Sequence, residues 1–496
     1  MSAGNPIEEK FALTPAIRAH AAWFAAISLA VLAPCFWQKH IEAGDLGSHV
    51  YDAWLAQLIR NGQAPGLYLA TQWNNSLFDT ILQIFCRWFG FAAGERIAVC
   101  AAVLIFFWGA ASFACAAARR VPWSVLPAIA MVSYGFIFHS GFFNFYLATG
   151  ISFWALSIFL GLRDAKRYLA FGLAPLIYFA HPVGFAWGFG ALVYCALVER
   201  IPGWARASLP LLPAAFFTFL HFYLPTHYPV NGPTTPRYLA NGADQLALSE
   251  DRHMYVAAAA FVLGLAACCV EAYARREEWR TPGRTGLLLQ LYAATQMAVL
   301  LLPGVVVLPN FAAPVSFLTE RFSLLSAVLG CGLLARVRPR AWHAAGFAAI
   351  AAAFFLFTYR ETALLDRMES QAEQLVRNLP QGQRVLETID SRPGSRLWFA
   401  NHMVDRACIG YCFAYANYEP SSGQFRVRAR PGNSIVMTSL EDTGDAEEGN
   451  YVVRPRDLPV WQIEPCREDM ARLCIRPLAA GERNGSPHVR HGEESE

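Results

Sequence analysis

The segment from Ala43 to Gly62 carries three side chains of the kinds that perform acid–base chemistry. Asp45, His49 and Asp52 stand at positions i, i+4 and i+7, so an α-helix would place them on one polar stripe. A simpler interpretation makes Asp45 the N-cap of that helix and leaves His49 and Asp52 on a solvated face. Spacing alone favours the simpler interpretation, so the surrounding elements have to decide between the two.

Further polar residues stand near the ends of apolar segments elsewhere in the chain. Two of these residues are arginines, and the guanidinium group of an arginine pairs with phosphate oxygens in a bidentate manner. Taken singly, each of these residues is explained as the polar end of an apolar segment. Besides His49 and Asp52, the candidates for substrate binding are Asn74, Asn75, Asp79, His181, Arg237, Glu320 and Arg321, and His139, Asn144, His221 and His227 occupy similar positions.

Charged residues are scarce and unevenly distributed along the chain. Only 16% of the 496 residues are charged, against ~25% in a typical soluble protein. Residues 361–496 hold 37 of the 77 charged residues, whereas residues 1–360 hold the other 40. This distribution excludes a cytosolic protein, a disordered chain and a coiled coil, and it predicts a membrane body followed by a soluble domain. The net charge of +3 is too small to indicate a nucleic-acid partner.

Apolar runs long enough to cross a bilayer recur throughout residues 1–360. The first, Ile17–Trp37, resembles a signal peptide, but Pro34 and the many later runs favour an uncleaved span. Leu77–Phe89 is too short to cross and carries two charges, so we interpret it as an interfacial helix. The other predicted spans are 96–118, 122–138, 143–162, 168–180, 183–199, 207–224, 254–273, 286–308, 322–337 and 341–358.

The positions of the basic residues give these spans an orientation. With 77–89 left out of the count, every basic cluster between the spans falls on the side of the N-terminus. About eleven spans therefore place the N-terminus in the cytoplasm and the C-terminus outside. Within 168–199, His181-Pro182 favours a turn between two short spans over a single kinked helix. The basic clusters are 119–120, 163–167, 200–206, 275–284 and 336–340.

The predicted fold is therefore a polytopic α-helical membrane domain, residues 1–360, with a C-terminal extracytoplasmic α+β domain. The outer loop 38–95 is expected to hold interfacial helices, the first of them lying flat on the outer surface. Residues 361–480 are expected to begin with a helix over 361–377 and to continue as short alternating strands. Residues 481–496 are polar and are predicted to be a disordered tail.

Cysteine usage supports an oxidising environment for the C-terminal domain. Four of the twelve cysteines lie there, an even number, so disulfide bonds are expected. Cys408 and Cys412 are spaced like two metal ligands on one helical face, but no nearby His-Cys pattern completes a zinc site. Four cysteines allow three pairings, and the sequence does not choose among them. The four are Cys408, Cys412, Cys466 and Cys474.

The order of the predicted elements resembles the GT-C superfamily of integral membrane glycosyltransferases, which use polyprenyl-phosphate-linked sugars. In that family an acidic residue begins the first outer loop, here Asp45, and an arginine opens the span after an interfacial helix, here Arg96. The interfacial helix is of the type Leu-Phe-Asp-Thr-Ile-Leu-Gln-Ile-Phe-Cys-Arg-Trp-Phe-Gly, here 77–90. The resemblance extends over 17–360 and suggests a bacterial branch. It departs from the family where Asp45-Leu46 replaces paired acids and where no Pro-Pro precedes residue 77.

The resemblance implies roles for particular residues. Asp45 matches the family's catalytic acid, which acts as general base on an acceptor hydroxyl or helps to hold a divalent cation, Mg²⁺ or Mn²⁺. Arg237 and Arg321 are the candidates to face the phosphate leaving group, and His49 and His181 the candidates to bind metal or acceptor. The implied partners are membrane lipid, a polyprenyl-phosphate sugar donor and a lipid, glycan or protein acceptor.

Two classes of function stay open on the sequence. The first is a glycosyltransferase that acts at the outer face of the membrane. The second is a non-catalytic membrane protein, either a lipid-linked-glycan transporter or a scaffold that presents the C-terminal domain. A transporter should show inverted repeats and polar sites at the midplane, and the sequence shows neither clearly. The aromatic and amide groups of 412–420 suit sugar faces and hydroxyls, so the C-terminal domain is expected to bind or cap the acceptor without performing chemistry.

Overall fold

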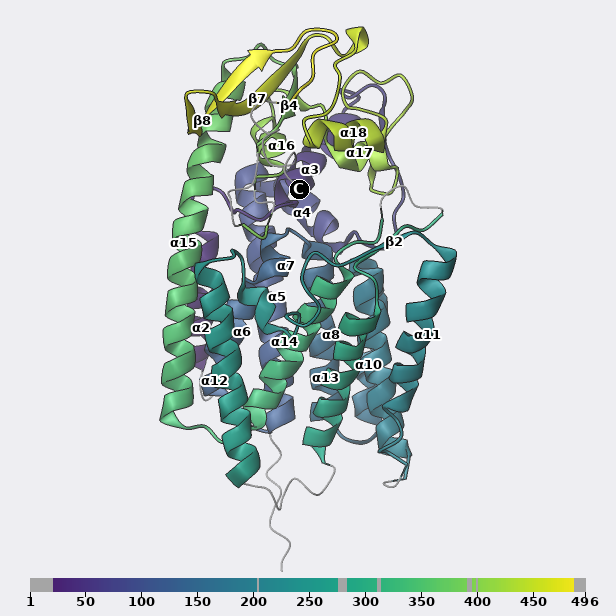
Figure 1. Ribbon diagram of the computed structural model, residues 1–496, viewed down its shortest axis with the longest axis vertical. Helices are drawn as coiled ribbons and strands as arrows, with labels where there is room; N and C mark the ends of the chain where they lie inside the picture. Colours follow the sequence, from purple (N-terminus) through teal and green to yellow (C-terminus); the bar gives the residue numbers. More distant parts are fainter. Residues whose placement is uncertain are drawn as a thin grey trace, which may run out of the picture.

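The computed structural model describes residues 21–202, 205–274, 283–309, 314–389, 395–397 and 400–485. The molecule is elongated, with long helices in its lower part and the C-terminal strands at its upper end (Figure 1). The start of the first predicted span and most of the predicted tail, 481–496, lie outside the described residues.

The lower part of the molecule is a bundle of apolar helices. Within the described residues, six helices are long and apolar enough to cross a membrane, and two shorter apolar stretches are Ala21–Cys35 and Trp123–His139. Every predicted span overlaps helical residues, while the number of eleven crossings stays a prediction. The six long helices are α5 (Phe91–Ala118), α8 (Phe143–Gly161), α10 (Pro182–Arg200), α12 (Arg252–Ala274), α14 (Leu318–Arg336) and α15 (Ala341–Arg377). The others are α2 (Ala21–Leu32), α6 (Leu126–Ser133), α7 (Phe136–His139), α9 (Ala174–Ala180), α11 (Leu211–His227) and α13 (Arg284–Leu301).

The interval 168–199 contains a break at His181, as the sequence favours. The Nδ1 atom of His181 accepts a hydrogen bond from the backbone N–H of Val183 at 3.2 Å and so caps α10. Pro182 is the first residue of α10, a position where its missing N–H costs nothing. The segment before the break is short, since α9 has seven residues and follows a 3-10 helix over Asp164–Leu173.

α15 is one continuous helix of 37 residues. A helix of this length measures about 55 Å, well beyond the ~30 Å of the hydrocarbon core. The prediction of a span over 341–358 and a separate helix over 361–377 is wrong, because residues 359–362 include no Gly or Pro to end the helix. The boundary predicted at 360 therefore falls inside one helix. This helix runs from the bundle into the part of the chain after Arg377, which we call the C-terminal segment (Figure 1).

The two ends of the bundle differ in what they carry. The loops 38–95 and 225–253 and the chain after α15 lie together at the upper end, as the span count predicts (Figure 1). Arginines gather at the opposite end, where Arg284 donates to the carbonyl oxygens of Ala116 and Leu160 at 2.7 Å each. The orientation of these ends relative to the cytoplasm stays a prediction.

Two helices of the first outer loop, α3 (Leu46–Arg60) and α4 (Leu77–Phe89), lie between the bundle and the C-terminal segment (Figure 1). The bounds of α4 are those predicted. The interpretation of α3 as a helix with a solvated polar face is wrong, because His49 is only 8% exposed and Asp52 only 6%. The C-terminal segment covers that face, and its strand β6 (Val427–Ala429) pairs antiparallel with β1 (Leu67–Leu69).

The C-terminal segment folds around a four-stranded sheet in the order β5-β4-β7-β8. β4 runs parallel to β5 and β7, and β8 runs antiparallel to β7. The mixture of helices and short strands agrees with the α+β content predicted for this part of the chain. The bounds are β4 (Arg384–Glu387), β5 (Phe413–Ala414), β7 (Val460–Cys466), β8 (Asp469–Pro477), α16 (Met403–Ala407), α17 (Tyr418–Ser422) and α18 (Leu440–Glu447).

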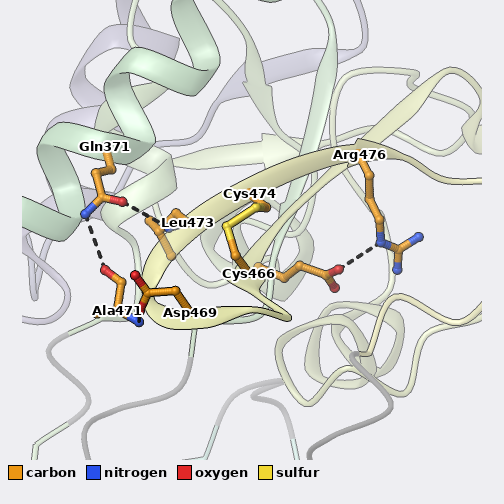
Figure 2. Close-up of a disulfide and its surroundings, with 8 residues drawn as sticks. Gln371, Cys466, Asp469, Ala471, Leu473, Cys474 and Arg476 are labelled. Carbon is orange, nitrogen blue, oxygen red and sulfur yellow. Dashed lines mark hydrogen bonds and ion pairs between the residues drawn. A yellow bond between two sulfur atoms is a disulfide. The ribbon is translucent and has the colours of Figure 1, made fainter.

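Two disulfides fasten this segment and use the four cysteines expected to form them. Cys408 pairs with Cys412, and Cys466 pairs with Cys474. Figure 2 shows the second disulfide across the β7–β8 hairpin, beside Gln371 of α15. The Gln371 side chain accepts a hydrogen bond from the backbone N–H of Leu473 at 3.0 Å, so the hairpin is tied to the long helix.

Candidate functional site

Three parts of the chain come close together at Asp45: the start of α3, the turn at 140–141 and the segment at His402. Glycines make this close approach possible. The backbone N–H of Asp45 donates to the carbonyl oxygen of Ser140 at 3.2 Å. A Cβ added at Gly141, which has φ +82°, would lie 2.5 Å from the Asp45 nitrogen. A Cβ added at Gly47 would lie 2.1 Å from the carbonyl oxygen of His402. Gly141 and Gly47 thus let the bundle and the C-terminal segment approach Asp45 from two sides.

The carboxylate of Asp45 does not cap α3. Asp45 occupies the N-cap position, yet no backbone N–H of the described helix donates to its side chain. The side chain is 28% exposed and lines a cavity of about 590 Å³. Of the residues predicted to form a site, Asp45, His49, Asn74, Asn75, His181 and Arg321 all line this cavity, together with Asn144.

A second, smaller cavity of about 300 Å³ meets the first at Asp45. Tyr418 also lines both cavities. The C-terminal segment contributes His402, Arg396 and Glu447, among others, to the lining of the second cavity. The sequence analysis predicted none of these three residues, because only tertiary packing brings them to the first outer loop.

His49 is a buried cation in an acidic setting. Its Nδ1 atom lies 2.7 Å from Asp79 Oδ1 and 3.6 Å from Glu419 Oε1. Burial alone disfavours the charged imidazole, but these carboxylates and Asp45 raise the pKa of His49 to about 9. Asp79 also accepts a hydrogen bond from Asn144 Nδ2 at 2.8 Å, and its pKa lies below the ordinary value.

Asp52 does not reach either cavity and faces a carboxyl group instead. Burial raises its pKa to about 7, and burial together with Asp52 places the pKa of the neighbouring Glu419 well above its ordinary value. The two carboxyl groups therefore hold at least one proton between them near neutral pH. Asp52 therefore lies beside Glu419, which acts on His49, and Asp52 itself lines neither cavity.

His402 lies against Asp45 from the C-terminal segment. Its Nε2 atom is 3.9 Å from Asp45 Oδ1, and its Nδ1 atom is 2.8 Å from Asp405 Oδ2. Burial opposes the charge on this imidazole, but Asp405 and Asp45 raise its pKa to about 10. Asp45 itself is subject to opposing influences. Burial raises the pKa of Asp45 more than His402, His49, Arg321 and Tyr418 lower it, so this pKa lies above its ordinary value.

Arg321 brings the second positive charge to the main cavity. It lies in the first turn of α14, and its Nη1 atom is 3.3 Å from His181 Nε2. Its guanidinium carbon lies 4.8 Å from the centre of the Phe142 ring. Its Nε atom is buried and has no hydrogen-bond partner among the described residues. A helix N-terminus with an unpaired guanidinium N–H suits an anionic ligand.

Two predicted site residues serve the loop 225–253 instead of the cavities. Glu320 Oε1 accepts hydrogen bonds from Thr234 Oγ1 at 2.6 Å and from the backbone N–H of Thr235 at 2.8 Å. Arg237 donates to the carbonyl oxygen of Leu302 at 2.9 Å. Glu320 Oε1 and Arg237 Nη2 thus hold the loop against the bundle, and neither residue lines a cavity with Asp45.

The groups around Asp45 do not suit the divalent cation that the sequence analysis considered. His402, His49 and Arg321 already surround the carboxylate with positive charge. Glu387, His402 and Asp405 have potential ligand atoms within 4.8 Å of one another. However, the Glu387 oxygens accept backbone N–H groups at 3.0 and 3.1 Å, and His402 and Asp405 are paired with each other. Fixed cations, rather than metal ligands, are what the residues offer here.

Comparison with known proteins bears on the fold. No family model and no curated protein matches the sequence. A solved structure does match, the crystal structure of ArnT from Cupriavidus metallidurans bound to undecaprenyl phosphate. The TM-score is 0.50 at 12% identity, and the match covers 92% of this chain and 98% of ArnT. The chain therefore has a fold similar to that of ArnT over most of the length of both chains.

Proposed function

We propose that this chain is a membrane glycosyltransferase that transfers a sugar from a polyprenyl-phosphate donor to a lipid, glycan or protein acceptor. The observation that carries the proposal is the placement of Asp45 and Arg321 on one cavity in a GT-C fold. A carboxylate and a guanidinium on one cavity supply a base for a hydroxyl and a counter-charge for a phosphate. The ArnT structure holds undecaprenyl phosphate, which makes that lipid the first donor carrier to test.

In the proposed reaction Asp45 acts on the acceptor, and Arg321 and His49 act on the phosphate leaving group. The acceptor oxygen forms a bond to the anomeric carbon of the sugar as its proton passes to Asp45. The bond between that carbon and the phosphate oxygen breaks, and the electron pair leaves with the polyprenyl phosphate. Arg321, whose Nε–H has no partner among the residues that the structure describes, and the charged His49 face the growing negative charge from the walls of the cavity.

The cellular setting follows from charge and cysteine placement. The two disulfides lie in the C-terminal segment, at the same end of the bundle as Asp45, and disulfides suit an oxidising compartment. The opposite end is rich in arginine, which suits the cytoplasm. We therefore place the site and the C-terminal segment at the outer face of a bacterial inner membrane, with the N-terminus in the cytoplasm.

Binding of undecaprenyl phosphate tests the donor half of the proposal. We expect this lipid to raise the thermal unfolding midpoint of the purified protein in nanodiscs, and undecaprenol, which lacks the phosphate, to raise it less. Arg321→Gln should lose the difference between the two lipids, because it removes the charge on the cavity wall. Arg237→Gln, which removes a guanidinium outside the cavity, is the matched control and should keep it. Equal responses of wild type to both lipids would refute phosphate recognition.

A further inference from the structure

We propose that His402, held by Asp405, is a positioning residue for Asp45 in the transfer reaction. Its imidazolium keeps the Asp45 carboxylate ionised and directed to the place where the two cavities meet. The inference rests on the proposed function for its chemical meaning, but its geometry stands independently. It assigns the C-terminal segment a part in the chemistry, whereas the sequence analysis expected that segment only to bind or cap the acceptor.

The backbone at His402 is held in an unfavourable conformation by several contacts. His402 has φ +67°, in the left-handed region that non-glycine residues seldom occupy. Glu387 accepts the backbone N–H groups of His402 and Val404 at 3.0 and 3.1 Å. The carbonyl oxygen of His402 lies where a Cβ on Gly47 would be. Strain that several contacts impose on one residue is typical of functional sites.

The imidazole of His402 bridges two carboxylates. Asp405 lies 2.8 Å from one ring nitrogen and Asp45 lies 3.9 Å from the other. Asp405 is fixed in turn, since its Oδ2 atom accepts a hydrogen bond from Asn417 Nδ2 at 2.6 Å. The other charged or titratable groups that act on Asp45 or His402 are His49 of α3, Arg321 of α14, Tyr418 of α17, Glu447 of α18 and Glu387 of β4.

The sign of the effect follows from what a general base requires. Asp45 has to be unprotonated to accept the proton of the acceptor hydroxyl, and burial works against this. A cation within 4–6 Å lowers the pKa of a carboxyl by ~1–3 units. Removal of the His402 charge should therefore shift the protonation of Asp45 to higher pH and narrow the active pH range from its acid side.

Carbodiimide labelling of Asp45 measures this coupling without any transfer reaction, because carbodiimides modify protonated carboxyl groups. The extent of modification at Asp45 would be followed by peptide mass spectrometry from pH 4 to pH 9. The informative variant is His402→Gly, since glycine accepts the left-handed backbone. His402→Lys keeps a positive charge, and Asp405→Asn weakens the charge on His402 without touching its backbone. Asp164→Gly replaces another left-handed residue away from the site and is the matched control.

We expect the labelling midpoint to rise by ~1–3 pH units in His402→Gly, to rise less in Asp405→Asn, and to stay near that of wild type in His402→Lys and Asp164→Gly. An unchanged midpoint in both His402→Gly and Asp405→Asn would overturn the proposal, as would an equal rise in His402→Lys and His402→Gly. In transfer assays His402→Gly should lower kcat on the acid side and leave the donor KM unchanged. If the chain transfers no sugar at all, the labelling result still stands, so the two proposals fail separately.

Discussion

At the scale of residues, the site is defined by one carboxylate among several fixed cations. Asp45 lines both cavities, and His402, His49 and Arg321 each lower its pKa against the effect of burial. The ionised form of Asp45 therefore depends on neighbouring side chains rather than on the N-terminus of α3, to which its carboxylate makes no capping bond within the described helix. Arg321 and His49 are also available to a phosphate leaving group, because both line the larger cavity.

This arrangement predicts a transfer reaction that needs no divalent cation. We expect EDTA to change the rate of undecaprenyl phosphate release by less than about twofold, because the charge that a metal ion would supply is already present on side chains. Added Mg²⁺ or Mn²⁺ should likewise have little effect. Loss of turnover in EDTA that Mn²⁺ restores would show that Asp45 acts as a metal ligand after all.

Part of this site could be predicted from the sequence because its residues lie on short segments. The helical spacing of Asp45 and His49 indicated a shared face, and the span count put Asn75 and Arg321 on the same side. His402 could not be predicted, because it lies more than 350 residues from Asp45 and no motif marks it. Its only signal was Asp405 three residues later, a spacing that surface helices commonly show.

At the scale of elements, the start of α3 has to fit against the C-terminal segment, and Gly47 makes that fit possible. Gly47→Ala should push the His402 backbone away from α3, because the added Cβ would lie 2.1 Å from its carbonyl oxygen. We expect a loss of stability of ~1–3 kcal/mol and a marked loss of transfer. Gly190→Ala, in α10 with nothing within 4 Å of its Cβ, is the control and should be neutral or slightly stabilising. Thermal unfolding in nanodiscs measures both, and equal midpoints would contradict the packing role.

The helices differ in how well their bounds and their burial could be predicted from the sequence. The bounds of α4 were predictable because its apolar run follows the polar residues 74–76 and ends at Gly90. The continuity of α15 was not, because hydropathy changes near residue 358 while the backbone has no reason to stop. The burial of α3 was also missed, since amphipathicity cannot distinguish a face covered by water from a polar face covered by protein.

At the scale of the whole molecule, the C-terminal segment is part of the site rather than an appendage. One hydrophobic core runs from the bundle through α3 into the sheet. Arg406 joins them electrostatically, since its Nε atom lies 2.6 Å from Glu369 of α15 and its Nη1 atom pairs with Glu95 of α5. The two cavities lie where bundle, outer loop and C-terminal segment meet. A protein that only presented this segment would not need a carboxyl group surrounded by His402, His49 and Arg321 at that junction.

The most direct test of the account is turnover by Asp45→Asn. Wild type, Asp45→Asn and the control Asp164→Asn would be supplied in nanodiscs with a panel of undecaprenyl-phosphate sugars and a membrane-lipid extract as the acceptor, and release of undecaprenyl phosphate would be followed. Asparagine keeps the shape of Asp45 but cannot take a proton, so Asp45→Asn should lose 100-fold or more of the rate, on the order of a general-base contribution. It should still respond to undecaprenyl phosphate in thermal unfolding, and Asp164→Asn should match wild type. Turnover by Asp45→Asn within a few-fold of wild type, or release by no protein in the series, would contradict the account.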